Sequence, residues 1–346
     1  MSNPYTLVFG QPPVENIERT AQAERIVSEF CQERPSNYIN LITGIRGCGK
    51  TVFITEIAER LRRRKEWIVV NLNPKRDLLV SLAAKLESDA ALRRIFKEAE
   101  INLQAFGIGI GIKGGYPVSD IEEALTRMLQ SIKKHGKRVL ITIDEASNTK
   151  EMRIFASSYQ IFLRERLPVF LLMTGLFKNI DRLRNADGMT FLERAPRTRL
   201  SSLDLTVISV RYKETLGIGE DKAIHLAHMT KGYPFAYQVL GYLRWDAGKK
   251  AELSKLIPDY DQHLEEYVYE KIWMDLSDND KKVVELLALN GEMKIKDIRD
   301  VLEMKSGSMS VYRDRLIRKG IVDASRYGYL SLVLPRFAEI VQRWVM

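Results

Sequence analysis

Cysteine and long apolar runs are both scarce in this sequence of 346 residues. Its two cysteines, Cys31 and Cys48, are too few for a disulfide framework, which indicates a reducing compartment. The longest apolar stretch, 168–177, is about half of what a membrane span needs, and it is interrupted by Thr174 and Gly175. The first residues, MSNPYTLVFGQPP, lack the charged start and apolar centre of a signal peptide. We therefore expect a cytoplasmic globular protein with no membrane partner.

Basic residues outnumber acidic ones by 54 to 45, so the formal net charge is +9. This excess is consistent with an anionic partner, although it does not identify one. Hydrophobic residues make up 45% and charged residues 29% of the chain, a balance that supports a sizeable core and excludes a disordered chain. At roughly 100–200 residues per domain, the length predicts two or three domains.

Short apolar runs alternate with longer amphipathic segments over the first 200 residues or so. Four runs have the uninterrupted hydrophobicity of strands covered by helices on both faces: 38–43, 67–72, 138–143 and 169–174. The helical patterns between them cover 51–65, 77–99, 119–135 and 151–166. Strands that alternate with helices predict an α/β domain with a parallel sheet.

The strand pattern ends near residue 206, and the chain then reads as helices broken at 217–219, 232–234 and 248. A new helical pattern begins after 276. We therefore predict three domains, at 1–205, 206–275 and 276–346. The Gly- and Ile-rich segment 107–115 suits an inserted surface hairpin, or alternatively a mobile loop that touches a partner.

The first predicted strand leads directly into GIRGCGKT at 44–51, a full match to the phosphate-binding pattern G-x-x-x-x-G-K-S/T. Glycines let the backbone N–H groups converge on phosphate oxygens at the N-terminus of the next helix, where the helix dipole favours anions. In this pattern Lys50 reaches the β- and γ-phosphates and Thr51 ligates Mg²⁺. The residues predicted to contact ATP or ADP are Gly44, Ile45, Arg46, Gly47, Cys48, Gly49, Lys50, Thr51 and Val52.

A phosphate-binding loop predicts an acidic residue at the end of another buried strand, and RVLITIDEAS supplies Asp144 and Glu145. Asp144 is expected to hold the Mg²⁺ shell, and Glu145 to orient or deprotonate the attacking water. The strand 169–174 ends in Thr174, whose hydroxyl is a candidate sensor of the γ-phosphate or the water. The adjacent Asp-Glu pair favours hydrolysis over binding alone.

These motifs resemble those of the AAA+/STAND group of P-loop ATPases, and more narrowly of archaeal ATPases and origin-recognition-like proteins with a C-terminal winged helix. The resemblance covers nearly the whole chain and also rests on FLERAPRTRLSSLDL (191–205) and TKGYPFAYQVLGYLRW (230–245). It implies an AAA+-type sheet followed by a helical lid. It also implies that Pro234 of the lid lies near the adenine, and that Arg194 turns towards the γ-phosphate, with Arg197 and Arg199 close by.

The last 70 residues or so predict a winged helix, with helices at 278–290 and 295–304, a third helix in SGSMSVYRDRLIRKG, and a hairpin over 321–334. On the third helix Met309, Tyr312 and Leu316 share one inward face. The segment 305–326 holds six basic and two acidic residues, which is consistent with phosphate contacts to double-stranded DNA. The DNA-binding candidates are Ser310, Arg313, Arg315, Arg318 and Arg326.

The sequence thus predicts a slow or regulated ATPase that acts as a switch on DNA, with ATP or ADP and Mg²⁺ as cofactors. One alternative is a STAND-like signalling scaffold, in which ATP drives self-association and the winged helix binds protein. Another is an ATPase helper of mobile-element replication or transposition, in which oligomers hydrolyse ATP in response to DNA.

Overall fold

The computed structural model describes residues 2–8, 13–99, 120–248 and 251–345, so the predicted hairpin or loop at 107–115 lies outside the described residues. Contacts divide the chain into two compact units. One unit comprises 19–43 and 50–199, and the other comprises 1–18, 44–49 and 200–346. The sequence-based division into three domains stays a prediction. In the described ranges, no helix combines the length and apolar character that crossing a bilayer requires.

The first unit is built on a parallel sheet with the strand order β2-β3-β4-β1-β5. The strands are β1 (Ile39–Thr43), β2 (Trp67–Leu72), β3 (Arg138–Ile143), β4 (Val169–Gly175) and β5 (Arg197–Arg199). The predicted parallel α/β sheet is confirmed, and its first four strands coincide with the four apolar runs. The fifth strand was not predicted, because its sequence Arg-Thr-Arg buries only the central threonine and carries no apolar signal.

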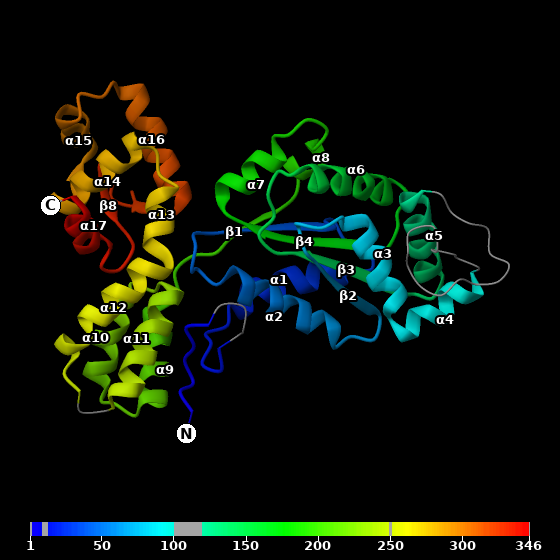
Figure 1. The fold of residues 1–346 in the computed structure, drawn as a ribbon, viewed down its shortest axis with the longest axis horizontal. Coiled ribbons are helices and arrows are strands. Elements are labelled where there is room, and N and C mark those ends of the chain that lie inside the picture. Colours follow the sequence, from blue (N-terminus) through cyan, green and yellow to red (C-terminus); the bar gives the residue numbers. More distant parts are fainter. Residues whose placement is uncertain (1, 9–12, 100–119, 249–250, 346) are drawn as a thin grey trace. The chain divides into compact units, whose positions relative to one another are not determined.

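Helices cover both faces of this sheet (Figure 1). Helices α1 (Thr20–Cys31) and α2 (Lys50–Arg62) lie on one face, where Phe30 and Trp67 both pack against Phe170 of β4. The opposite face packs into a large apolar core with α3 (Leu78–Ser88), α5 (Ile121–Lys134), α6 (Lys150–Arg164) and α7 (Phe177–Arg184). Two short helices, α4 (Ala90–Glu98) and α8 (Thr190–Glu193), complete the described part of this unit.

The segment 77–99 was predicted as one helix, but the structure divides it into α3 and α4. Asp89 is the reason, because its carboxylate accepts hydrogen bonds from the backbone N–H groups of Ala91 and Leu92. A side chain that caps the next helix in this way requires extended backbone at its own position.

The second unit contains the helices of the predicted lid and the predicted winged helix. The lid helices are α9 (Leu205–Leu216), α10 (Glu220–Thr230), α11 (Pro234–Ala247) and α12 (Ile257–Leu264). A short 3₁₀ turn (Leu253–Lys255) precedes α12, and a π-helical turn (Glu265–Tyr269) joins it to α13 (Glu270–Met274). The N-terminal segment packs on the lid, where the Tyr5 ring lies so close to Gly241 that a side chain there would collide with it.

The winged-helix region holds a three-stranded antiparallel sheet of order β6-β8-β7 and four helices. Its elements are α14 (Asp278–Asn290), β6 (Met293–Lys294), α15 (Ile295–Val301), α16 (Ser306–Lys319), β7 (Val322–Asp323), β8 (Tyr329–Leu332) and α17 (Phe337–Val345). Helix α14 begins at the capping box that Ser277 and Asp280 form. The predicted winged-helix fold is confirmed, with α17 as an additional element that packs against α14 (Figure 1).

Candidate nucleotide site

The phosphate-binding loop has a backbone that only glycine adopts easily at two positions. Gly47 has φ of +70° and Gly49 has φ of +86°, both in the left-handed region. Helix α2 starts at Lys50, directly after this loop, so the positive end of its dipole follows the loop along the chain. The left-handed glycines and the helix that follows them are the features on which the predicted phosphate-binding loop depends.

Within the second unit, the loop is held by the start of α11. The Tyr233 hydroxyl donates to the Arg46 carbonyl at 2.5 Å, and the Phe235 N–H donates to the Gly47 carbonyl at 3.1 Å. Pro234 stands between these two donors as the first residue of α11, a position where its missing N–H costs nothing. The structure thus brings Pro234 beside the predicted phosphate loop.

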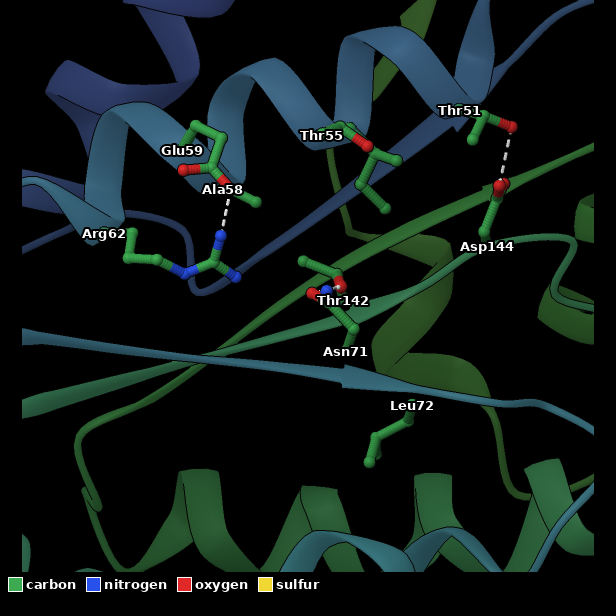
Figure 2. Close-up of a pocket in the computed structure, with 10 residues that line it drawn as sticks. Thr51, Thr55, Ala58, Glu59, Arg62, Asn71, Leu72, Thr142 and Asp144 are labelled. Atoms are coloured by element: carbon green, nitrogen blue, oxygen red, sulfur yellow. Dashed lines mark hydrogen bonds and ion pairs between the residues drawn. The ribbon is translucent and has the colours of Figure 1, made fainter. Parts of the chain in front are cut away.

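In the first unit, Asp144 joins three elements at the carboxyl end of the sheet. The Thr51 hydroxyl, at the start of α2, donates to Asp144 Oδ2 at 2.7 Å (Figure 2). Thr174, at the end of β4, donates to the other carboxylate oxygen of Asp144. Thr174 is fully buried, and its hydroxyl here positions Asp144; its role as a sensor of the γ-phosphate or the water stays a prediction.

Glu145 is exposed and has a left-handed backbone, with φ of +56°. Its N–H donates to Asp144 Oδ1 at 3.0 Å and to the Thr174 hydroxyl at 3.3 Å, and the next N–H, of Ala146, donates to the Thr174 carbonyl at 2.8 Å. Left-handed backbone at a residue other than glycine is costly and is concentrated at functional sites. The surrounding backbone hydrogen bonds offset that cost, and the residue stays exposed.

A pocket of about 170 Å³ lies between α2 and the strands β2 and β3. Figure 2 shows Thr51 and Asp144 at one end and the ion pair of Arg62 with Glu59 at the other. This volume is large enough to hold several water molecules.

The oxygens at this end of the pocket fit Mg²⁺. A threonine hydroxyl and an aspartate carboxylate are hard ligands of the kind that Mg²⁺ prefers, and the remaining ligands are ordinarily waters and phosphate oxygens. Thr51 and Asp144 already lie within hydrogen-bond distance of each other, so one ion with its waters reaches both.

The three candidate arginines at the end of the first unit are all exposed. Arg194 ends α8, and Arg197 and Arg199 lie in β5. Arg184, which the sequence did not single out, donates to the carbonyls of Leu192 and Glu193 at 3.0 and 2.6 Å and so fixes the end of α8. Burial, together with the nearby charge of Arg197, lowers the pKa of the Arg184 guanidinium.

On α16, the structure gives Arg315 an internal partner. Its guanidinium donates to the fully buried carboxylate of Asp280 at 2.7 and 2.9 Å and to the Ser277 hydroxyl at 2.8 Å. Lys319 approaches the same carboxylate at 3.3 Å. Arg315 therefore connects α16 to α14, a role that the sequence did not suggest.

The other DNA-binding candidates lie on α16 and in the wing between β7 and β8. Arg318 and Ser310 are exposed on α16. Arg313 pairs with its neighbour Asp314 at 2.8 Å. In the wing, Arg326 pairs with Glu292 at 2.5 Å and lies 3.8 Å from the centre of the Tyr329 ring.

Comparisons with known proteins agree with this fold. Residues 21–166 match the family described as an ATPase domain predominantly from Archaea, and residues 266–341 match a domain of unknown function. The ORC2 protein of Aeropyrum pernix superposes in its ADPNP–ADP complexes with a TM-score of 0.60, at 16% identity, over 97% of this chain and 96% of that one. Its ADP form gives a TM-score of 0.52 at 14% identity, over the same shares of the two chains. No curated protein matches the sequence.

The fold is therefore a P-loop-like parallel α/β sheet followed by a helical region and a winged helix, as in the ORC2 structures. Residues 21–166 are similar to the predominantly archaeal ATPase domain, in line with the resemblance seen in the sequence.

Proposed function

We propose that the protein is an ATP-binding and ATP-hydrolysing switch that acts on double-stranded DNA through its winged helix. The observation that carries the ATPase part is the junction of Thr51, Asp144 and Thr174 at the start of α2, directly after a full GIRGCGKT motif. Cys31 and Cys48 are both free thiols, which supports the cytoplasm as its compartment.

In this proposal the loop N–H groups and Lys50 bind the phosphates, and Thr51 and Asp144 hold Mg²⁺. When bound, Mg²⁺ neutralises charge that develops on the phosphate oxygens. Thr174 keeps the Asp144 carboxylate in place, and Glu145 orients the attacking water and accepts its proton. Pro234 contacts the adenine from the lid, and Arg194 turns towards the γ-phosphate.

The proposed domains are an ATPase base (1–205), a lid (206–275) and a winged helix (276–346). ATP binding closes the lid on the base, and hydrolysis reopens it. This movement changes how the winged helix meets DNA. The solved ORC2 structures contain nucleotides, which supports a nucleotide-dependent switch on the same fold.

Fluorescent-ATP binding and phosphate release together test the ATPase part. Lys50→Ala is expected to abolish nucleotide binding, whereas Glu145→Gln is expected to keep binding and lose turnover. Lys85→Ala, which changes an exposed lysine in the last turn of α3, is the matched control and should change neither. Unchanged hydrolysis in both site variants would rule out this assignment.

The DNA part rests on the exposed cations of α16 and the wing. A cation that contacts a phosphate contributes about one unit to the slope of log affinity against log salt concentration. Arg318→Ala should therefore weaken duplex binding and reduce that slope by about one, while Lys271→Ala on α13 should not. Equal slopes for both variants would show that Arg318 of α16 does not contact the DNA phosphates.

One observation favours the signalling-scaffold alternative, because the outward side of α16 also presents Val311, which is 59% exposed, and the exposed carboxylate of Asp314. An apolar and acidic surface suits a protein partner better than a phosphate backbone. Self-association that requires ATP, in a protein without DNA affinity, would support that function.

A further inference from the structure

Tyr233 makes an unusually close contact with the phosphate-binding loop. Its ring is buried, and its hydroxyl donates to the Arg46 carbonyl at 2.5 Å. A Cβ built on Gly47 would collide with that hydroxyl and would press on the Phe235 Cβ. Glycine at this position therefore serves the approach of Tyr233 as well as the left-handed backbone.

The two contacts from α11 fix consecutive peptide planes of the loop. The Tyr233 hydroxyl holds the carbonyl of the Arg46–Gly47 peptide, and the Phe235 N–H holds that of the Gly47–Cys48 peptide. In a planar trans peptide the N–H points opposite to its carbonyl. The Gly47 N–H therefore points away from the Tyr233 hydroxyl, and such N–H groups are what a phosphate-binding loop offers its ligand, while the Cys48 N–H donates to the Ile45 carbonyl at 3.4 Å.

The same tyrosine also contacts Tyr269, which in turn contacts the winged-helix region. Its ring stacks on that of Tyr269, with centroids 6.4 Å apart and an interplanar angle of 24°. The Tyr269 hydroxyl donates to the Pro335 carbonyl at 2.6 Å, and its ring packs edge-on against Phe337 of α17 at 4.9 Å. Tyr269 ends the π-helical turn, a geometry that is frequent at functional positions.

A second contact joins the loop to the end of α13. Arg46 Nη2 lies 3.6 Å from a carboxylate oxygen of Asp275, the residue that follows α13. The loop therefore meets both the start of α11 and the end of α13.

We infer that Tyr233 is a positioning residue of the nucleotide site, which sets the loop peptides for phosphate binding and transmits the state of the loop through Tyr269 to α17. This inference rests on the proposed ATP binding and is independent of DNA binding. Burial raises the pKa of the Tyr233 hydroxyl well above its usual value, so it stays protonated and able to donate.

The test uses three Tyr→Phe variants of the full chain, each of which removes one buried hydroxyl and keeps the ring. Tyr233→Phe removes the contact to the loop, and Tyr269→Phe removes the contact to Pro335. Tyr212→Phe is the control, because its hydroxyl donates at 2.8 Å to the Tyr237 carbonyl, away from the loop. Affinity for a non-hydrolysable ATP analogue and hydrogen exchange of residues 334–345, with and without that analogue, are measured for each.

Tyr233→Phe loses one hydrogen bond to the loop, so its affinity for the ATP analogue should fall about three- to tenfold. Tyr269→Phe should bind with wild-type affinity but show less nucleotide-dependent protection of 334–345. Wild-type affinity and protection in Tyr233→Phe, or an equal loss of affinity in Tyr212→Phe, would overturn the inference. A wild-type protein that binds no nucleotide would instead overturn the proposed function, and this inference with it.

Discussion

Replacing Asp280 by alanine should loosen α16 from α14, because its carboxylate is the common partner of two cations from α16. The carboxylate is 0% exposed, whereas the side chains of Arg315 and Lys319 are 37% and 16% exposed. It also accepts from the Ser277 N–H at 3.3 Å and so completes the capping box of α14. One substitution therefore removes a buried ion pair and part of a helix cap.

Breaking a buried ion pair costs about 3–5 kcal/mol when the remaining charge stays buried. Here Arg315 can turn to water, which reduces the cost, while Lys319 has less room to do so. Loss of part of the cap adds about 0.5–1 kcal/mol. We therefore expect the free energy of unfolding to fall by about 3 kcal/mol, which corresponds to a urea midpoint lower by about 1.5 M at a typical dependence near 2 kcal/mol per molar.

Urea unfolding of the full chain, followed by tryptophan fluorescence, measures this shift. Trp273 and Trp344 lie 5.4 Å apart in the same compact unit and report its transition. Arg299→Ala is the control, because its pair with the exposed Asp300 is a surface pair worth about 0–1 kcal/mol. A midpoint shift no larger than that of the control would refute the reasoning.

A double-mutant cycle of Asp280→Ala with Arg315→Ala extends the test. If the two side chains act as one pair, the double variant should be more stable than the sum of the single changes predicts. A coupling energy near zero would contradict the ion pair.

Three further predictions concern the second compact unit. Glu15→Gln should lower its stability by about 1–3 kcal/mol, because the buried carboxylate accepts from Arg211 at 2.7 and 3.3 Å; thermal unfolding measures the loss. Gly232→Ala should cost more stability than Gly291→Ala. Both glycines have left-handed backbone, but only a Cβ at 232 would collide with another backbone carbonyl, that of Leu203; equal losses of stability would contradict this. Asp261→Asn should speed hydrogen exchange of α17, because its carboxylate accepts hydrogen bonds at 2.8–3.0 Å from Arg336, just before α17, and from Arg343 within it; unchanged exchange would contradict this.

Local sequence signals were enough for much of the fold. The four long strands can be recognised as uninterrupted apolar runs, and α14 is bounded by its own capping box and by Gly291. By contrast, β5 depends on pairing with β1, more than 150 positions earlier along the chain, and its three residues carry no periodicity. The break at Asp89 was missed because aspartate inside an amphipathic pattern also suits an exposed helix position.

The nucleotide motifs were visible because their chemistry is local. Lys50 and Thr51 are adjacent, and the pairing of Asp144 with Thr51 follows from where parallel strands end. The loop partner of Tyr233 could not be found in this way, because Arg46 lies 187 positions earlier along the chain. On α16, helical spacing correctly placed Met309 and Leu316 in the core but could not reveal that Arg315, beside Leu316, meets a buried carboxylate on α14.

The most direct test of the central claim is the anisotropy of a fluorescent DNA duplex, titrated with the full chain in ADP and in a non-hydrolysable ATP analogue at two salt concentrations. The account predicts salt-sensitive binding whose affinity differs between the two nucleotide states and is weakened by Arg318→Ala. Equal affinity in both states, or no binding in either, would contradict a nucleotide-dependent switch on DNA.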